Sequence, residues 1–171
     1  MNTEIITAIN NQIQAEIYSS NLYLSMSSWA NAHGYKGMSH WLKQQALEEH
    51  THAMKFIAFL EDRNAQPEIL QIDKPDAEWS GIKEVFEKVL AHEQKVTRLI
   101  NDIYDLALSH KDHASTSFLQ WFIDEQVEEE ATASEILDEI SLAGEKGVGI
   151  YMIDKELGQR IQVSTAIGNE A

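Results

Sequence analysis

The sequence contains no cysteine, only two prolines and only eight glycines in 171 residues. Without cysteine there is no disulfide, no thiolate metal ligand and no cysteine nucleophile. The scarcity of proline and glycine leaves long stretches without helix breakers. No run approaches about 18 apolar residues, so we expect no membrane-spanning helix. The first residues carry no basic segment followed by an apolar one, so we expect no secretory signal. These absences predict a soluble, cytoplasmic protein.

Positive charge is also scarce. The chain has 13 Lys and Arg against 28 Asp and Glu, which gives a formal net charge of -15. Nucleic-acid binding depends largely on Lys and Arg at phosphates, so this balance argues against such a partner. An acidic chain favours cations, but net negative charge also keeps a helical protein dispersed. Charge alone leaves both interpretations open.

Apolar residues that recur every three or four positions predict four long helices and a short fifth one. The expected ranges are 3–32, 37–64, 80–110, 114–143 and 150–157. Thr3 and Ser80 are the expected N-caps, and Gly34 is the expected stop of the first helix. The length suits a single domain. We expect this domain to cover 1–161 and the small polar residues 162–171 to form a flexible tail.

The connection at 65–79, bracketed by Pro67 and Pro75, shows no helical period. A helix of about 28 residues is about 42 Å long. About 15 extended residues span about 50 Å, so this connection can cross the whole bundle. The second and third helices would then be parallel. An excursion that returns to the same end of the bundle is the alternative.

The chain carries one pattern of polar residues twice. The first set is Glu16, Glu49 and His52, and the second, 77 positions later, is Glu93, Gln126 and Glu129. The apolar frame shifts equally, as from Ile5 to Ile82, Ile9 to Phe86, Leu42 to Leu119 and Leu60 to Leu137. This repetition predicts one helical hairpin used twice, with polar groups near the middle of each helix.

These polar residues fall on the apolar stripes, so their side chains point toward the core. A buried, unpaired carboxylate is strongly disfavoured as an ion, and no Lys or Arg lies on the same stripes nearby. Two divalent cations would offset the charge. Residues at i and i+3 share one helical face, so Glu49 and His52 can hold one ion together, and Gln126 and Glu129 are spaced alike. Oxygen-rich ligands with one imidazole suit iron, manganese or, less selectively, zinc.

The motifs that carry a family resemblance are Glu16 with Tyr23 seven residues on, Glu49-His50-Thr51-His52, Glu93, and Glu125-Gln126-Val127-Glu128-Glu129. At these positions the chain resembles the ferritin family, specifically prokaryotic non-haem ferritins. Ferritin-like bundles take a Glu from each of two helices and Glu-x-x-His from each of the other two. This chain departs at the fourth helix, where Gln126-x-x-Glu129 stands. The resemblance implies an all-α ferritin-like four-helix bundle with a long crossover between helices two and three and a short fifth C-terminal helix.

The resemblance implies iron storage with ferroxidase activity and no haem. Two Fe(II) ions bind within one subunit, O₂ or hydrogen peroxide takes their electrons, and Fe(III) oxide is stored in a shell of twenty-four subunits. Glu16, Glu49 and His52 would hold the first iron with Glu49 bridging, and Glu93 and Glu129 the second with Gln126 nearby.

The family also implies two further assignments. Glu48, Glu125 and Glu128, with Glu129, match a third iron position; the alternative is a solvated acidic face. Tyr23 would hydrogen-bond a ligand or supply an electron; the alternative is a core aromatic with a satisfied hydroxyl.

Three other functions compete with this one. A haem-containing bacterioferritin would carry Glu-x-x-His on its fourth helix and a methionine where this chain has His50. A DNA-protecting mini-ferritin generally lacks the fifth helix and places its iron between subunits. An acidic helical scaffold without metal chemistry would tolerate joint replacement of Glu16, Glu49 and Glu93 by apolar residues.

Overall fold

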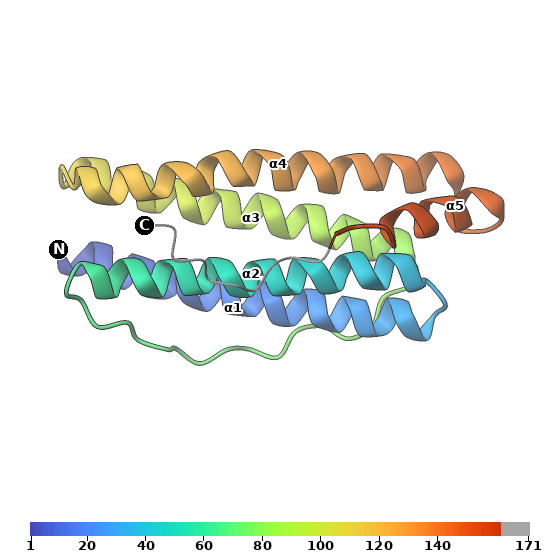
Figure 1. Ribbon diagram of the computed structural model, residues 1–171, viewed down its shortest axis with the longest axis horizontal. Helices are drawn as coiled ribbons and strands as arrows, with labels where there is room; N and C mark the ends of the chain where they lie inside the picture. Colours follow the sequence, from blue (N-terminus) through green and yellow to red (C-terminus); the bar gives the residue numbers. More distant parts are fainter. Residues whose placement is uncertain (162–171) are drawn as a thin grey trace.

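The computed structural model describes residues 1–161, and the predicted tail 162–171 lies outside them. Its helices are α1 (Thr3–Ala32), α2 (Lys36–Asp62), α3 (Ile82–Ser109), α4 (His113–Ala143) and α5 (Val148–Leu157). The long helices form two antiparallel hairpins, α1 with α2 and α3 with α4, packed side by side (Figure 1). The short α5 contacts α2 and α4 at one end of the bundle. Over residues 1–161, no helix is both long and apolar enough to cross a bilayer.

The segment between α2 and α3 runs along the outside of the bundle from one end to the other (Figure 1). Helices α2 and α3 are therefore parallel, which confirms the predicted crossover and rules out the returning excursion. Three hydrogen bonds attach the segment to α1: Glu68 N to Asn10 Oδ1 at 3.0 Å, Gln14 Nε2 to Gln71 O at 2.5 Å, and Ser25 Oγ to Asp76 O at 2.7 Å.

The apolar core is divided into two clusters. The cluster nearer α5 includes Met26, Trp41, Phe86, Ile140 and Ile153. The cluster at the opposite end includes Ile9, Phe56, Ile100, Leu119 and Phe122. Between them, each long helix contributes buried polar side chains instead of apolar ones. The bundle is thus apolar toward both ends and polar in the middle.

Helix ends lie within two residues of the predicted positions, but the predicted caps of α1 and α3 are wrong. Asn2 caps α1, since its Oδ1 accepts a hydrogen bond from Glu4 N at 2.7 Å. Thr3 is already helical because the polar residue before it supplies the acceptor. Gly34 follows the end of α1 with φ +93, as expected for a left-handed closing position.

Helix α3 begins at Ile82, with Gly81 as its N-cap residue. Ser80 does not accept from the helix. Instead its amide and its hydroxyl both donate to the Glu84 carboxylate, each at 2.6 Å. The acceptor at this helix start is therefore the acidic residue of the first turn.

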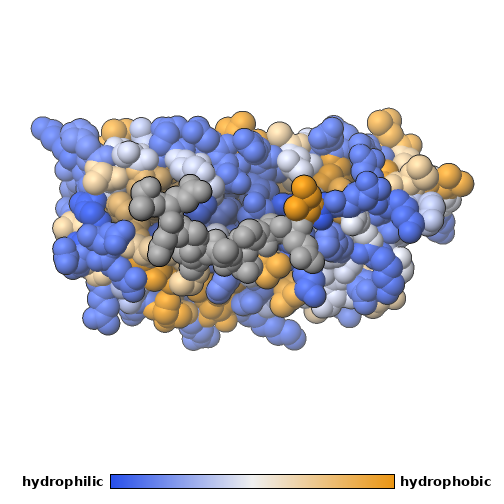
Figure 2. Space-filling view, in the orientation of Figure 1, coloured by the Kyte–Doolittle hydropathy of each residue, from blue (hydrophilic) through white to orange (hydrophobic). Residues whose placement is uncertain are grey.

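The surface is mostly hydrophilic, but apolar side chains gather at the end where α4 leads into α5 (Figure 2). Leu142 is 90% exposed and Val148 is 77% exposed. Tyr151 and Met152, on α5, are also exposed. We call Leu142, Val148, Tyr151 and Met152 the α5 apolar patch.

Candidate metal centre

The polar middle layer contains all six residues that the repeated pattern predicts as ligands. They are Glu16 from α1, Glu49 and His52 from α2, Glu93 from α3, and Gln126 and Glu129 from α4, and none is more than 7% exposed. The two apolar clusters enclose this layer from both ends. Every long helix thus contributes to one water-poor site.

Glu16, Glu49 and His52 form a close triad, with one ligand atom of each within 4.8 Å of the others. Glu49 and His52 share a face of α2, and His52 Nδ1 lies 3.4 Å from Glu49 Oε2. Glu16 faces them from the antiparallel α1. One Glu16 oxygen accepts a hydrogen bond from Gln12 Nε2 at 2.8 Å. The other, Oε2, is buried and has no hydrogen-bond partner within residues 1–161. A buried carboxylate oxygen without a donor fits a cation.

On the opposite side of the layer, uncharged donors hold the Glu93 carboxylate. The Tyr23 hydroxyl donates to one oxygen, and Gln126 Nε2 donates to the other at 3.2 Å. Gln126 Nε2 also lies 3.2 Å from the Glu93 backbone oxygen. Gln126 therefore orients Glu93 in this arrangement, with its nitrogen rather than its oxygen directed at the site.

Two buried glutamines take part that the sequence reasoning missed. Gln12 donates to Glu16, and Gln45 Nε2 donates to Glu129 Oε2 at 2.8 Å. Each glutamine lies four residues before a predicted ligand, Glu16 or Glu49, and therefore on the same helical face. That spacing is the sequence signal from which both glutamines could have been predicted as partners of the ligands.

Burial is the main cause of the electrostatic state of the layer. It raises the pKa of Glu16 and Glu49 well above the usual range, and nearby carboxylates raise both further. Burial also raises the pKa of Glu93, and burial with the charges of Glu93 and Glu48 raises that of Glu129 to about 8. Within residues 1–161, none of these four carboxylates forms an ion pair with Lys or Arg. Protons therefore compete with cations for these carboxylates, and a cation that binds displaces any proton they hold.

The Tyr23 phenol is fully buried in the same layer. Burial, followed by the negative charge of Glu93, raises its pKa well above the ordinary value. Tyr23 therefore remains a neutral hydrogen-bond donor to Glu93.

A second group of ligand atoms lies beside the layer. Glu48, His52 and Glu125 each place one ligand atom within 4.8 Å of the others, and both carboxylates are half-buried. The structure thus brings together two of the predicted third-position residues and adds His52. Glu128 is exposed and is not part of this close group, although its charge contributes to the raised pKa of Glu125, whose main cause is burial.

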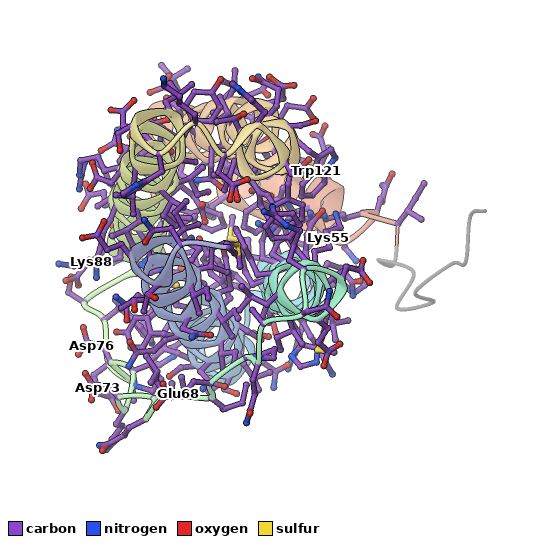
Figure 3. The ribbon with its side chains drawn as sticks, turned by 90° about the vertical axis from the view of Figure 1, so that its left-hand side faces the viewer. Lys55, Glu68, Asp73, Asp76, Lys88 and Trp121 are labelled. Carbon is purple, nitrogen blue, oxygen red and sulfur yellow. The ribbon has the colours of Figure 1, made fainter. Side chains whose placement is uncertain are left out.

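Lys55, on α2, and Trp121, on α4, lie close together (Figure 3). The charges of Glu125 and Glu48 act on Lys55, so the pair lies near this second group. The Lys55 ammonium lies 3.1 Å from the centre of the Trp121 ring. That ring meets the His52 imidazole edge-on, with 5.4 Å between centroids. Sequence periodicity did not single out either residue, because both lie off the apolar stripes.

A family model described as a ferritin-like domain matches residues 6–143. The chain belongs to the ferritin family. It is 40% identical over 154 residues to a bacterial non-heme ferritin of Escherichia coli, covering 90% of this chain and 93% of that protein. A bacterial non-heme ferritin of Bacteroides fragilis is 45% identical over 153 residues, covering 90% and 95%. Among solved structures, an open pore ferritin from Archaeoglobus fulgidus matches with a TM-score of 0.93 and 40% identity, covering 94% of this chain and 99% of that one.

The family, the all-helical fold with its fifth helix, and the Glu–His cluster confirm the predicted function. This ferritin is an iron-storage protein with ferroxidase activity. The curated relatives are non-heme ferritins, which favours that class over the haem-containing alternative. Family membership and the buried cluster also leave no support for an acidic scaffold without metal chemistry.

Proposed function

We propose that this ferritin oxidises Fe(II) at a centre of two ions within each subunit. The observation that carries the proposal is the buried layer of carboxylates with raised pKa values, in which, among residues 1–161, no Lys or Arg pairs with them and one Glu16 oxygen has no hydrogen-bond donor. Glu16, Glu49 and His52 hold the first ion, and Glu49 bridges to the second. Glu93 and Glu129 hold the second ion, and Gln126 orients Glu93.

The buried carboxylate layer favours the oxidation of Fe(II) to Fe(III). Anionic oxygen ligands in a water-poor site are attracted more strongly to Fe(III) than to Fe(II), so they favour loss of an electron. Two ions supply two electrons, and with two protons these convert one O₂ to hydrogen peroxide. The protons displaced when metal binds are available nearby. Tyr23 keeps Glu93 in place by donating its hydroxyl hydrogen.

Three finer assignments belong to the same proposal. A third ion binds at Glu48 and Glu125, with Glu128 at its exposed side and His52 and Glu129 beside it.

The subunits form a shell of twenty-four, for which the α5 apolar patch supplies surface that a lone subunit leaves in water. The shell works in the cytoplasm. The raised pKa of buried Glu129, to about 8, supports cation binding at the inner layer rather than at isolated surface acids.

The test is anaerobic Fe(II) titration of the metal-free protein followed by exposure to O₂. We expect a fast phase that consumes about two Fe(II) per subunit, as in other two-metal carboxylate bundles. Glu49→Ala and His52→Ala remove ligands of the first ion and should slow this phase by on the order of tenfold or more. Glu61→Ala, which removes an exposed acid from the same helix, is the control. Unchanged rates in the first two variants, with shells intact by particle mass, would contradict the assignment.

A further inference from the structure

Arg160 lies beyond α5, yet its side chain reaches the middle of α2. Its Nη2 donates to Glu48 Oε2 at 2.6 Å, and its Nη1 donates to Gln45 Oε1. The guanidinium carbon lies 4.9 Å from the centre of the Trp41 ring. His40 Nε2 donates to the Arg160 backbone oxygen at 2.9 Å. Four separate contacts with α2 therefore hold this arginine in one place.

The carboxylate that Arg160 binds is also a candidate metal ligand. Glu48 belongs to the close group with His52 and Glu125. A guanidinium 2.6 Å from Glu48 Oε2 occupies the carboxylate that a divalent cation would use, and the two positive charges repel each other. The pair is only partly shielded from water, with 25% of the Arg160 side chain and 23% of the Glu48 side chain exposed. The ion pair is therefore open to exchange.

Arg160 is also connected to the inner layer through Gln45. Because Arg160 donates to the Gln45 oxygen, the amide nitrogen of Gln45 is turned toward Glu129, where it donates to Oε2 at 2.8 Å. The same arginine thus contacts one third-position ligand and fixes the hydrogen-bond partner of a second-ion ligand. Lys55, on which the charges of Glu48 and Glu125 also act, lies instead over Trp121.

We propose that Arg160 is a tethered counter-cation, a side chain that occupies Glu48 until a metal ion displaces it. It keeps the affinity of the third position below the value that the acids alone would give. An ion there is held weakly and is released readily, which suits a position that passes iron onward. This inference rests on the proposed third position and adds a residue that controls it.

The test is calorimetric titration of the assembled, metal-free, full-length protein with Zn²⁺, a probe without redox chemistry. In Arg160→Gln we expect the weakest-bound Zn²⁺ to bind on the order of tenfold more tightly, a larger change than for either tight ion, of which only the one held by Glu129 is linked to Arg160 through Gln45. Lys155→Gln removes the same charge from an exposed position on α5 and should change no ion. Equal affinity of the weak ion in wild type and Arg160→Gln would overturn the proposal.

Glu48→Gln separates this proposal from the one it rests on. It should remove the weak ion, and adding Arg160→Gln to it should then have no effect. If the weak ion survives Glu48→Gln, the third position is wrongly assigned and the role of Arg160 falls with it. If Glu48→Gln abolishes binding of the weak ion but Arg160→Gln leaves its affinity unchanged, only the role of Arg160 is wrong. The two tight ions report separately on the inner centre.

Crystal structures of the protein with and without Zn²⁺ give a direct second readout. Without metal, the guanidinium should lie on Glu48, and with Zn²⁺ it should have left that carboxylate. A structure in which Zn²⁺ and Arg160 both contact the Glu48 carboxylate would overturn the exchange even if affinities change.

Discussion

At the residue scale, the pKa of a carboxylate in this protein depends on whether a Lys or Arg side chain forms an ion pair with it. Although burial raises the pKa of Asp112, hydrogen bonds from Arg63, at 3.1 and 3.2 Å, hold it below the ordinary range. Among residues 1–161, the Glu129 carboxylate accepts a hydrogen bond from the amide of Gln45, and the pKa of Glu129 rises to about 8. A divalent cation binds the second kind of site without first displacing a basic side chain.

This difference predicts how stability depends on pH in the metal-free protein. The pKa of Glu129 is about 8 when folded and near 4.5 when unfolded, so the folded state holds a proton that the unfolded state releases. Stability from this group is therefore present at low pH and is lost as pH rises through about 8. Burial lowers the pKa of His92 to about 4, which gives the opposite slope below about pH 6.5.

The measurement is thermal unfolding in a chelator between about pH 7.5 and pH 8.5, where His92 is largely neutral in both states. We expect the unfolding temperature to fall as pH rises. Glu129→Gln, which cannot titrate, should reduce this slope, and saturating Zn²⁺ should raise stability most at the high-pH end. A slope that is identical in Glu129→Gln would show that Glu129 is ionised in the metal-free fold.

At the element scale, the long helices and the ligand layer were predictable because both depend on periodicity. Ile5, Ile9 and Ile13 mark one stripe, and Glu16 continues it, so its burial followed from the same pattern. Arg160 was not predictable, because its contact with Glu48 depends on how the chain turns after α5. The cap of α1 was missed because two adjacent polar residues, Asn2 and Thr3, both suit an N-cap.

Helix α5 is attached to the start of α2 by backbone contact and by one carboxylate. Asp154 Oδ1 accepts a hydrogen bond from Met38 N at 2.9 Å, which satisfies an amide in the first turn of α2. A Cβ added at Gly37 would lie 1.5 Å from the Asp154 backbone oxygen. Only glycine therefore permits α5 to pack this closely, and α5 in turn places Arg160 against α2.

Gly37→Ala should detach α5 because the overlap is with backbone, which cannot move aside without moving the helix. We expect faster tryptic cleavage after Lys155 and Arg160 and a fall in unfolding temperature of several degrees, on the order expected for 1–2 kcal/mol in a domain of this size. Gly81→Ala is the control, since the atoms nearest its Cβ would belong to the flexible side chain of Glu145 and not to backbone. If the tryptic rate in Gly37→Ala equals that of the control, α5 is not held by this contact.

At the scale of the whole molecule, the proposed two-ion centre and the storage of its product make different demands on the chain. The buried layer is complete within one subunit, since all four long helices of the same chain contribute to it. Storage needs an enclosed volume, which a single bundle lacks. The α5 apolar patch is one surface suited to association, because burying apolar area contributes about 25 cal/mol per Å².

Leu142→Lys with Val148→Lys tests this separation of roles. Two charges in the α5 apolar patch should weaken subunit contacts while the helices persist, because both side chains are exposed within the subunit. We expect a smaller particle by light scattering, near-normal initial oxidation of about two Fe(II) per subunit, and precipitation of further Fe(III) that the shell no longer encloses. Asn101→Lys, at an exposed position on α3, controls for added charge. An unchanged particle mass would place the patch in solvent in the assembled protein, whereas loss of the fast phase would tie the two-ion centre to assembly.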